Sequence, residues 1–101
     1  MRYWLSYDLG LRGHYNELYE WLDNVNAKEC GESVATFLSD MSPQEIEDEL
    51  EEILNTGARI YLVWKPEIGS IKGKFILGKR KKKPPWFGYA EVEEDVEDLM
   101  E

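Results

Sequence analysis

Cysteine, histidine and long apolar runs are scarce in this chain of 101 residues. Its one cysteine, Cys30, cannot form a disulfide within the chain, which is typical of a protein from a reducing compartment. With His14 as the one histidine, a Ser-His-Asp or Cys-His catalytic arrangement has no second histidine to draw on. We expect His14 in the first turn of a helix and Cys30 as a small buried residue. No apolar segment long enough for a signal peptide or a membrane span is visible, so we expect a cytoplasmic protein without a membrane partner.

Basic residues are scarce in the first part of the chain and concentrated further on. Residues 1–57 carry three basic side chains against thirteen acidic ones, whereas residues 58–90 carry nine basic side chains against Glu67 alone. Residues 91–101 contain seven acids and no base. The net charge of −9 therefore conceals a basic block between two acidic ones, and the total does not exclude nucleic-acid binding.

The first part of the chain predicts a strand, a helix and a hairpin. Arg2–Leu9 is rich in aromatic residues, as strands are, and the glycines at 10 and 13 break it. Apolar side chains then recur at helical spacing, at Tyr15, Leu18, Tyr19, Leu22 and Val25. This pattern predicts a helix that ends near residues 24–26. Residues 27–30 and 33–39 are expected to pair as a hairpin across a turn at Gly31-Glu32.

The second helix has the best marked beginning. Ser42 is its expected N-cap, Pro43 suits the first helical position, and Glu45 completes a capping box. An apolar stripe follows, and Gly57 is the expected stop. Beyond it we predict strands at 59–65 and 72–78, and a short acidic helix within the tail, residues 91–101.

The predicted order is strand, helix, two strands, helix, strand, and this order is typical of a ferredoxin-like α+β fold. Residues 1–90 would form one such domain, with an extra C-terminal strand at 72–78. Several strands carry apolar side chains on both faces, for example Trp4 beside Tyr3, and Tyr61 beside Ile60. A second apolar face is costly to leave in water. We therefore expect a second copy of the chain, or the terminal helix, to cover it.

A set of these features resembles a known family. The features are Tyr7-Asp8 at the end of the first strand, the helix at 15–25, Ser33-Val34 opening a later strand, an acidic helix, and the strand Arg59-Ile60-Tyr61. Over roughly residues 2–65, their order and spacing resemble the small subunit of the CRISPR spacer-acquisition complex and the related virulence-associated D-type proteins. The chain departs from that family in its long basic tract and its acidic tail.

The resemblance implies a ferredoxin-like homodimer joined through the open sheet faces, with the extra strand docked on the partner's sheet. It also implies that Asp8 lies on the two-fold axis as a ligand for Mg²⁺ or Mn²⁺ in phosphodiester cleavage. A two-fold axis would supply a pair of carboxylates from one residue. The alternative is that Asp8 is a strand-end turn residue that accepts backbone N–H bonds.

A basic tract beside aromatic residues is the most nucleic-acid-like feature. It consists of Lys79, Arg80, Lys81, Lys82 and Lys83, with Trp86 close by. Basic side chains neutralise phosphates, and aromatic rings provide stacking surfaces for bases. Alternatively, the tract is a solvated loop or pairs with the acids of residues 91–101.

Two function hypotheses follow. The first is a small homodimeric protein that binds RNA or DNA, with a metal-dependent nuclease activity through Asp8 as an extension. The alternative is a non-enzymatic interaction or inhibitor protein that binds a basic protein partner through its acidic surfaces.

Overall fold

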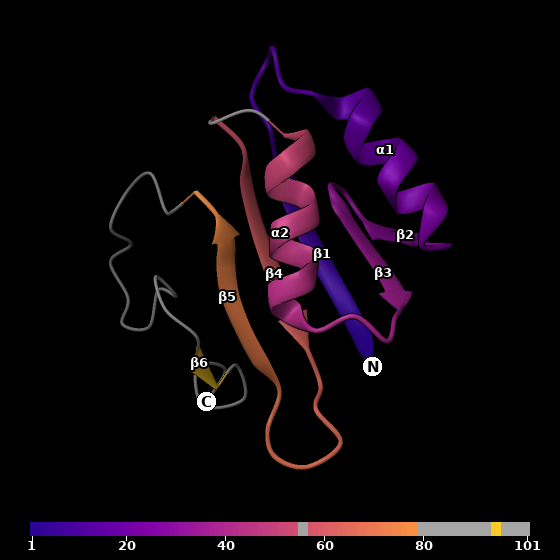
Figure 1. Cartoon of the computed structure of the whole chain (residues 1–101), viewed down its shortest axis with the longest axis vertical. Coiled ribbons are helices and arrows are strands. Elements are labelled where there is room, and N and C mark those ends of the chain that lie inside the picture. The colour runs from indigo at the N-terminus through magenta and orange to yellow at the C-terminus, as the bar shows by residue number, and fades with distance from the viewer. Residues whose placement is uncertain (55–56, 79–93, 96–101) are drawn as a thin grey trace.

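The computed structural model describes residues 1–54, 57–78 and 94–95. The elements are β1 (Arg2–Asp8), α1 (Tyr15–Asn24), β2 (Lys28–Gly31), β3 (Val34–Leu38), α2 (Pro43–Ile53), β4 (Arg59–Trp64), β5 (Lys72–Leu77) and β6 (Glu94–Asp95). The strands form one sheet in the order β2-β3-β1-β4-β5-β6, and neighbouring strands are antiparallel. Both helices lie over one face of this sheet (Figure 1). The protein is therefore α+β, and its architecture is compatible with the ferredoxin-like fold predicted from the sequence.

The C-terminal strands extend the sheet beyond β4. β5 pairs with β4 of its own chain, and its docking on a partner's sheet, which the resemblance implied, stays a prediction. Glu94 and Asp95, where a helix was expected, form β6 and pair with β5. The other residues of the predicted terminal helix lie outside the described residues.

α2 begins as its sequence predicts. The Ser42 hydroxyl accepts a hydrogen bond from the Glu45 backbone N–H at 3.1 Å, and the Glu45 carboxylate accepts one from the Ser42 N–H at 3.1 Å. Each contact satisfies an N–H group that the helix itself cannot use. The predicted stop at Gly57 is wrong, because α2 ends at Ile53. Leu54 adopts extended backbone angles and buries its side chain in the core.

α1 ends in a tight reversal that leads directly into β2. Asn26 has a φ of +57°, and its N–H donates to the carbonyl of Asp23. The next N–H, of Ala27, donates to the carbonyl of Leu22. This pair of bonds is a Schellman motif, in which asparagine tolerates the left-handed conformation. The β2–β3 turn lies at Glu32-Ser33, one residue later than predicted, because Ser33 takes the positive φ.

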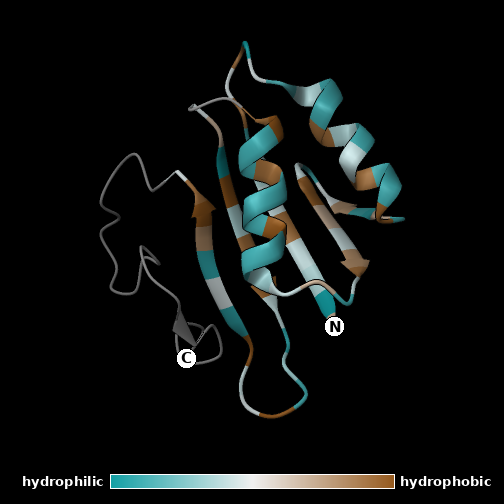
Figure 2. Ribbon diagram, in the orientation of Figure 1, coloured by the Kyte–Doolittle hydropathy of each residue, from teal (hydrophilic) through white to brown (hydrophobic). Residues whose placement is uncertain are grey.

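The core lies between the helices and the sheet. Tyr3, Leu5, Phe37, Ile60 and Leu62 are the sheet residues that it encloses most completely. Helix residues complete it, and the outward sides of both helices are hydrophilic (Figure 2). Burial raises the pKa of Tyr3 to about 12, and the charge of Glu45 adds to the shift. In the described parts of the chain, no helix is long and apolar enough to span a membrane.

Candidate functional site

The sheet face turned away from the helices carries aromatic side chains. Side chains of paired strand residues share a face, and Trp4 pairs with Thr36 of β3 and Val63 of β4. Tyr61, two residues before Val63 on β4, lies opposite Phe75 of β5 on the same face. Their rings meet edge to face with their centroids 5.0 Å apart. Trp4, Tyr61 and Phe75 are all partly exposed. We call this surface the sheet face.

Basic side chains share the sheet face with these rings. Arg2 of β1 donates from Nη1 to the Thr36 hydroxyl at 3.4 Å, and Lys28 of edge strand β2 pairs with the same Thr36. Arg59 lies at the start of β4, beside the end of β1. In the register of the sheet, Arg2 and Lys28 therefore lie near Trp4, whereas Arg59 lies opposite Asp8 at the other end of β1.

Asp8, the metal ligand implied by the resemblance, is in contact with Arg59. Its Oδ2 accepts a hydrogen bond from Nη2 of Arg59 at 3.0 Å, and its Oδ1 accepts one from the Gly10 N–H at 3.1 Å. Asp8 thus makes the strand-end turn contact that the sequence left open as the alternative. A hollow of about 150 Å³ adjoins this pair and is lined by Ser6, Tyr7, Asp8, Arg59, Tyr61 and Phe75.

Arg59 has donor capacity beyond its bond to Asp8. Its Nε–H is buried and has no acceptor among the residues that the structure describes. Leaving a buried donor unpaired is unfavourable, and a guanidinium group matches the oxygens of a phosphate. The Nε–H of Arg59 is therefore a donor that the described residues leave unused.

Metal-ligand atoms come together elsewhere in the described chain. Glu47, Asp48 and Glu51 of α2 hold their carboxylate oxygens within 4.8 Å of one another. Within residues 1–54 and 57–78, Asp8 belongs to no such group of three. A Mg²⁺ or Mn²⁺ site at Asp8 stays a prediction, as does nucleic-acid contact by the basic tract at 79–83 and Trp86, which lie outside the described residues.

The helices carry the opposite charge from the sheet face. Every charged side chain within α1 and α2 is acidic: Glu17, Glu20, Asp23, Glu45, Glu47, Asp48, Glu49, Glu51 and Glu52. Two of them contact neighbouring elements. Oε1 of Glu47 lies 3.5 Å from Nζ of Lys74 on β5. Oε1 of Glu49 accepts a hydrogen bond from the indole N–H of Trp21. The molecule therefore has an acidic helix layer and a basic, aromatic sheet face.

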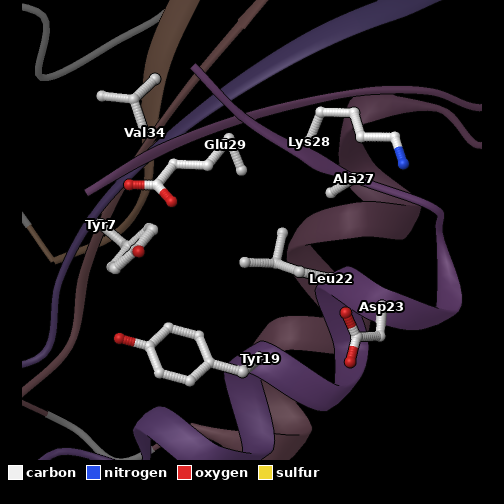
Figure 3. A pocket seen from close by; sticks show the side chains of 9 residues that line it. Tyr7, Tyr19, Leu22, Asp23, Ala27, Lys28, Glu29 and Val34 are labelled. Carbon is white, nitrogen blue, oxygen red and sulfur yellow. The ribbon is translucent and has the colours of Figure 1, made fainter. Parts of the chain in front are cut away.

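A second hollow, of about 350 Å³, lies between α1 and the strands (Figure 3). We call it the tyrosine hollow; its lining residues are Tyr7, Tyr19, Leu22, Asp23, Ala27, Lys28, Glu29, Val34 and Ala35. The rings of Tyr7 and Tyr19 meet at 74° with their centroids 6.1 Å apart. Burial raises the pKa of Tyr7, and so do Tyr19, Glu29 and Tyr15.

The sequence pointed to neither the tyrosine hollow nor the exposure of Cys30. Cys30 is exposed and not buried as expected, because β2 is an edge strand whose residues all face solvent. His14 precedes α1 as its N-cap residue, exposed, with Nδ1 3.3 Å from the Ile53 carbonyl oxygen. Asn26 was the available signal for the hollow, since an asparagine after an amphipathic helix indicates a reversal that would bring β2 back beside α1.

Comparison of the chain with models of protein families, with curated proteins and with solved structures gave no match.

Proposed function

We propose that this protein binds single-stranded RNA or DNA on the sheet face of a ferredoxin-like domain extended by β5. The observation that carries the proposal is the separation of charge between the two layers. The helices present acids alone, whereas the sheet face presents three cations, Arg2, Lys28 and Arg59, against the one acid Asp8 that is paired with Arg59. A polyanion is repelled by the helix layer and attracted to the sheet face. The separation of charge, and not the overall charge of −9, therefore directs nucleic acid to one side of the molecule.

The rings on the sheet face supply the second component of such a site. Flat antiparallel sheets that recognise single strands stack bases on aromatic side chains that project from central strands. Trp4 lies on β1, which is flanked by β3 and β4 in the middle of the sheet. Tyr61 lies on the neighbouring strand. Stacking contributes about 1–3 kcal/mol per base, and it tolerates any base because every base has a π-face.

The proposal concerns binding and not cleavage. Hydrolysis through a metal at Asp8 would require the Asp8 carboxylate to exchange its bond with Arg59 for a cation. Arg59 is better used as a phosphate contact, since its guanidinium lies beside the 150 Å³ hollow. The tract at 79–83 follows β5 in the sequence, and it would add phosphate contacts to those of the sheet face.

A second copy of the chain is the competing occupant of the same face, as the sequence analysis expected. Two sheet faces brought together would place Arg2, Lys28 and Arg59 of one copy near the cations of the other. Like charges at an interface oppose association. A homodimer of this kind would be weak, and nucleic acid would displace it because it occupies the same face and is attracted by the cations that repel a second copy.

The acidic helix layer supports a second candidate function, the binding of a basic protein. Its acids are mostly exposed, and six of them are on α2. This surface lies on the opposite side of the sheet from the proposed nucleic-acid site (Figure 1). The two functions therefore make separable predictions for variants of the helices and of the sheet.

Fluorescence anisotropy with a labelled single-stranded oligonucleotide, repeated over a salt series, tests the proposal. Each phosphate contact on a single strand contributes about −0.7 to the slope of log K against log salt. Arg2→Gln should weaken binding and make the slope shallower by about this amount. Arg12→Gln is the matched control, because Arg12 is exposed in the loop before α1 and changes the net charge equally.

Ring stacking is tested in the same assay. Trp4→Leu keeps an apolar side chain but removes the ring, and it should weaken binding about tenfold or more. Tyr19→Leu removes a partly exposed ring from the helix layer and should leave affinity unchanged. Equal effects of the two substitutions, or no binding by the wild type at low salt, would reject the sheet face as the site.

A further inference from the structure

The tyrosine hollow has the composition of a cation site. Carboxylates line it from two elements, Asp23 on α1 and Glu29 on β2. Figure 3 shows the Asp23 carboxylate directed toward the hollow, and the Glu29 carboxylate beside the Tyr7 ring. The ammonium group of Lys28 points away from the hollow in the same view. The local charge is therefore negative although a lysine belongs to the lining.

Aromatic rings form the second part of this environment. Tyr7 and Tyr19 stand nearly perpendicular to each other, and Tyr15 packs against both, at 6.5 Å and 5.9 Å between centroids. The face of an aromatic ring attracts a cation through its quadrupole, more strongly where water is excluded. Leu22 and Ala35, both buried, supply an apolar base. Rings, apolar base and carboxylates together suit an ion that is both charged and partly apolar.

We propose that the tyrosine hollow binds a substituted ammonium group, that is, an aliphatic amine or its methylated form. A volume of about 350 Å³ lies at the lower end of ligand pockets and is sufficient for such a group. A hard divalent metal fits less well, because within residues 1–54 and 57–78 neither Asp23 nor Glu29 belongs to a group of three converging ligands. Anions, including nucleic acid, are repelled by Asp23 and Glu29. The charge of its carboxylates therefore distinguishes this site from the basic sheet face, although Lys28 belongs to both.

The fold places the two carboxylates together through the reversal at the end of α1. The bond from the Ala27 N–H to the Leu22 carbonyl and the positive φ of Asn26 return the chain toward the helix within three residues. Asp23 precedes this reversal and Glu29 follows it, so both side chains reach the same hollow. The placement of the two carboxylates thus depends on a local motif, whereas Tyr7 of β1 and Ala35 of β3 reach the hollow through the packing of α1 against the sheet.

The probe for this proposal is choline, compared with its uncharged carbon isostere 3,3-dimethylbutan-1-ol. Titrations of the full chain would be followed by NMR shifts of the backbone amides of Tyr19, Asp23 and Glu29. We expect choline to bind in the millimolar range or tighter and the neutral alcohol at least about tenfold more weakly. Equal affinity for the two would overturn the proposal, as would no shift with choline.

Substitutions separate the contributions of charge and ring. Glu29→Gln should weaken choline binding about tenfold, whereas Glu32→Gln, which removes an equal charge from the nearby β2–β3 turn, should not. Tyr19→Phe keeps the ring and should retain binding, whereas Tyr19→Leu should lose it. Tyr19 is 46% exposed, so the protein should remain folded in both variants. A loss in Glu32→Gln equal to that in Glu29→Gln would show unspecific attraction and reject the site.

One further comparison identifies the source of the amine. A short peptide that contains trimethyllysine can add backbone contacts along the exposed edge strand β2, which free choline cannot. Affinity for the peptide about tenfold above that for choline would assign the group to a protein partner. Equal affinities would assign it to a small free amine. Both results depend on the same contact of the ammonium group with the tyrosine hollow. If neither choline nor the peptide binds, the proposed ammonium site is overturned.

Discussion

Asp8 accepts a hydrogen bond from Nη2 of Arg59 at 3.0 Å, where the last residue of β1 lies opposite the first residue of β4. Their side chains are 44% and 28% exposed, respectively. An ion pair that open to water contributes modestly to stability. Its main effect is to fix the orientation of the Arg59 guanidinium at the edge of the sheet face.

Asp8→Asn tests whether this residue is a structural partner or a metal ligand. Asparagine keeps an oxygen for the Gly10 N–H and removes the charge, so the free energy of unfolding should fall by about 0.5 kcal/mol. Oligonucleotide affinity should be retained or strengthened, since Arg59 would no longer be shared with a carboxylate. Urea unfolding and anisotropy measure the two effects. A Mg²⁺-dependent rise in the wild-type unfolding midpoint that disappears in Asp8→Asn would instead make Asp8 a metal ligand.

Ser42→Ala tests the capping box of α2. The substitution removes the acceptor of the Glu45 N–H, and the free energy of unfolding should fall by about 1 kcal/mol. The urea midpoint should decrease while the slope of the transition stays the same. Gln44→Ala, in the same exposed first turn, is the control and should change stability by less than about 0.5 kcal/mol. Equal effects of the two substitutions would contradict the capping role.

Local motifs account for what the sequence predicted correctly. The capping box of α2 is contained within Ser42-Pro43-Gln44-Glu45, so the sequence specified it without reference to the rest of the fold. The sequence likewise predicted that Ile60 and Tyr61 lie on opposite faces of β4, because neighbouring side chains of one strand alternate between its faces. The α+β class could be predicted because such local signals occur in a definite order along the chain.

Tertiary packing explains what the sequence did not predict. Gly57 is a reasonable stop for a helix, yet α2 ends earlier because burial of Leu54 in the core requires extended backbone. The contact of Asp8 with Arg59 joins residues 51 positions apart, and it depends on strand register. The tyrosine hollow likewise requires α1 to lie against the strands. Neither site could be predicted from spacing along the chain.

Sedimentation velocity tests the homodimer expected from the sequence. At micromolar concentration we expect a species of about twice 11.9 kDa, held by the sheet faces and weakened by their like charges. Saturating single-stranded oligonucleotide should convert this dimer to oligonucleotide-bound monomers, because the oligonucleotide and the second copy of the chain compete for the same face. A dimer that persists at saturation would place the interface elsewhere. A monomer in the absence of oligonucleotide would make the expected dimer wrong and leave the sheet face open.

A map of the residues that respond to nucleic acid tests most directly whether the sheet face binds it. A ¹⁵N-labelled sample of the full chain would be titrated with a short single-stranded oligonucleotide at low salt, where phosphate contacts are strongest. Binding on the sheet face should shift the backbone amides of β1, β3 and β4 and the indole N–H of Trp4, while the amides of α1 and α2 should not shift. Shifts confined to the helices, or to no described residue at all, would contradict the assignment of the sheet face as the nucleic-acid site.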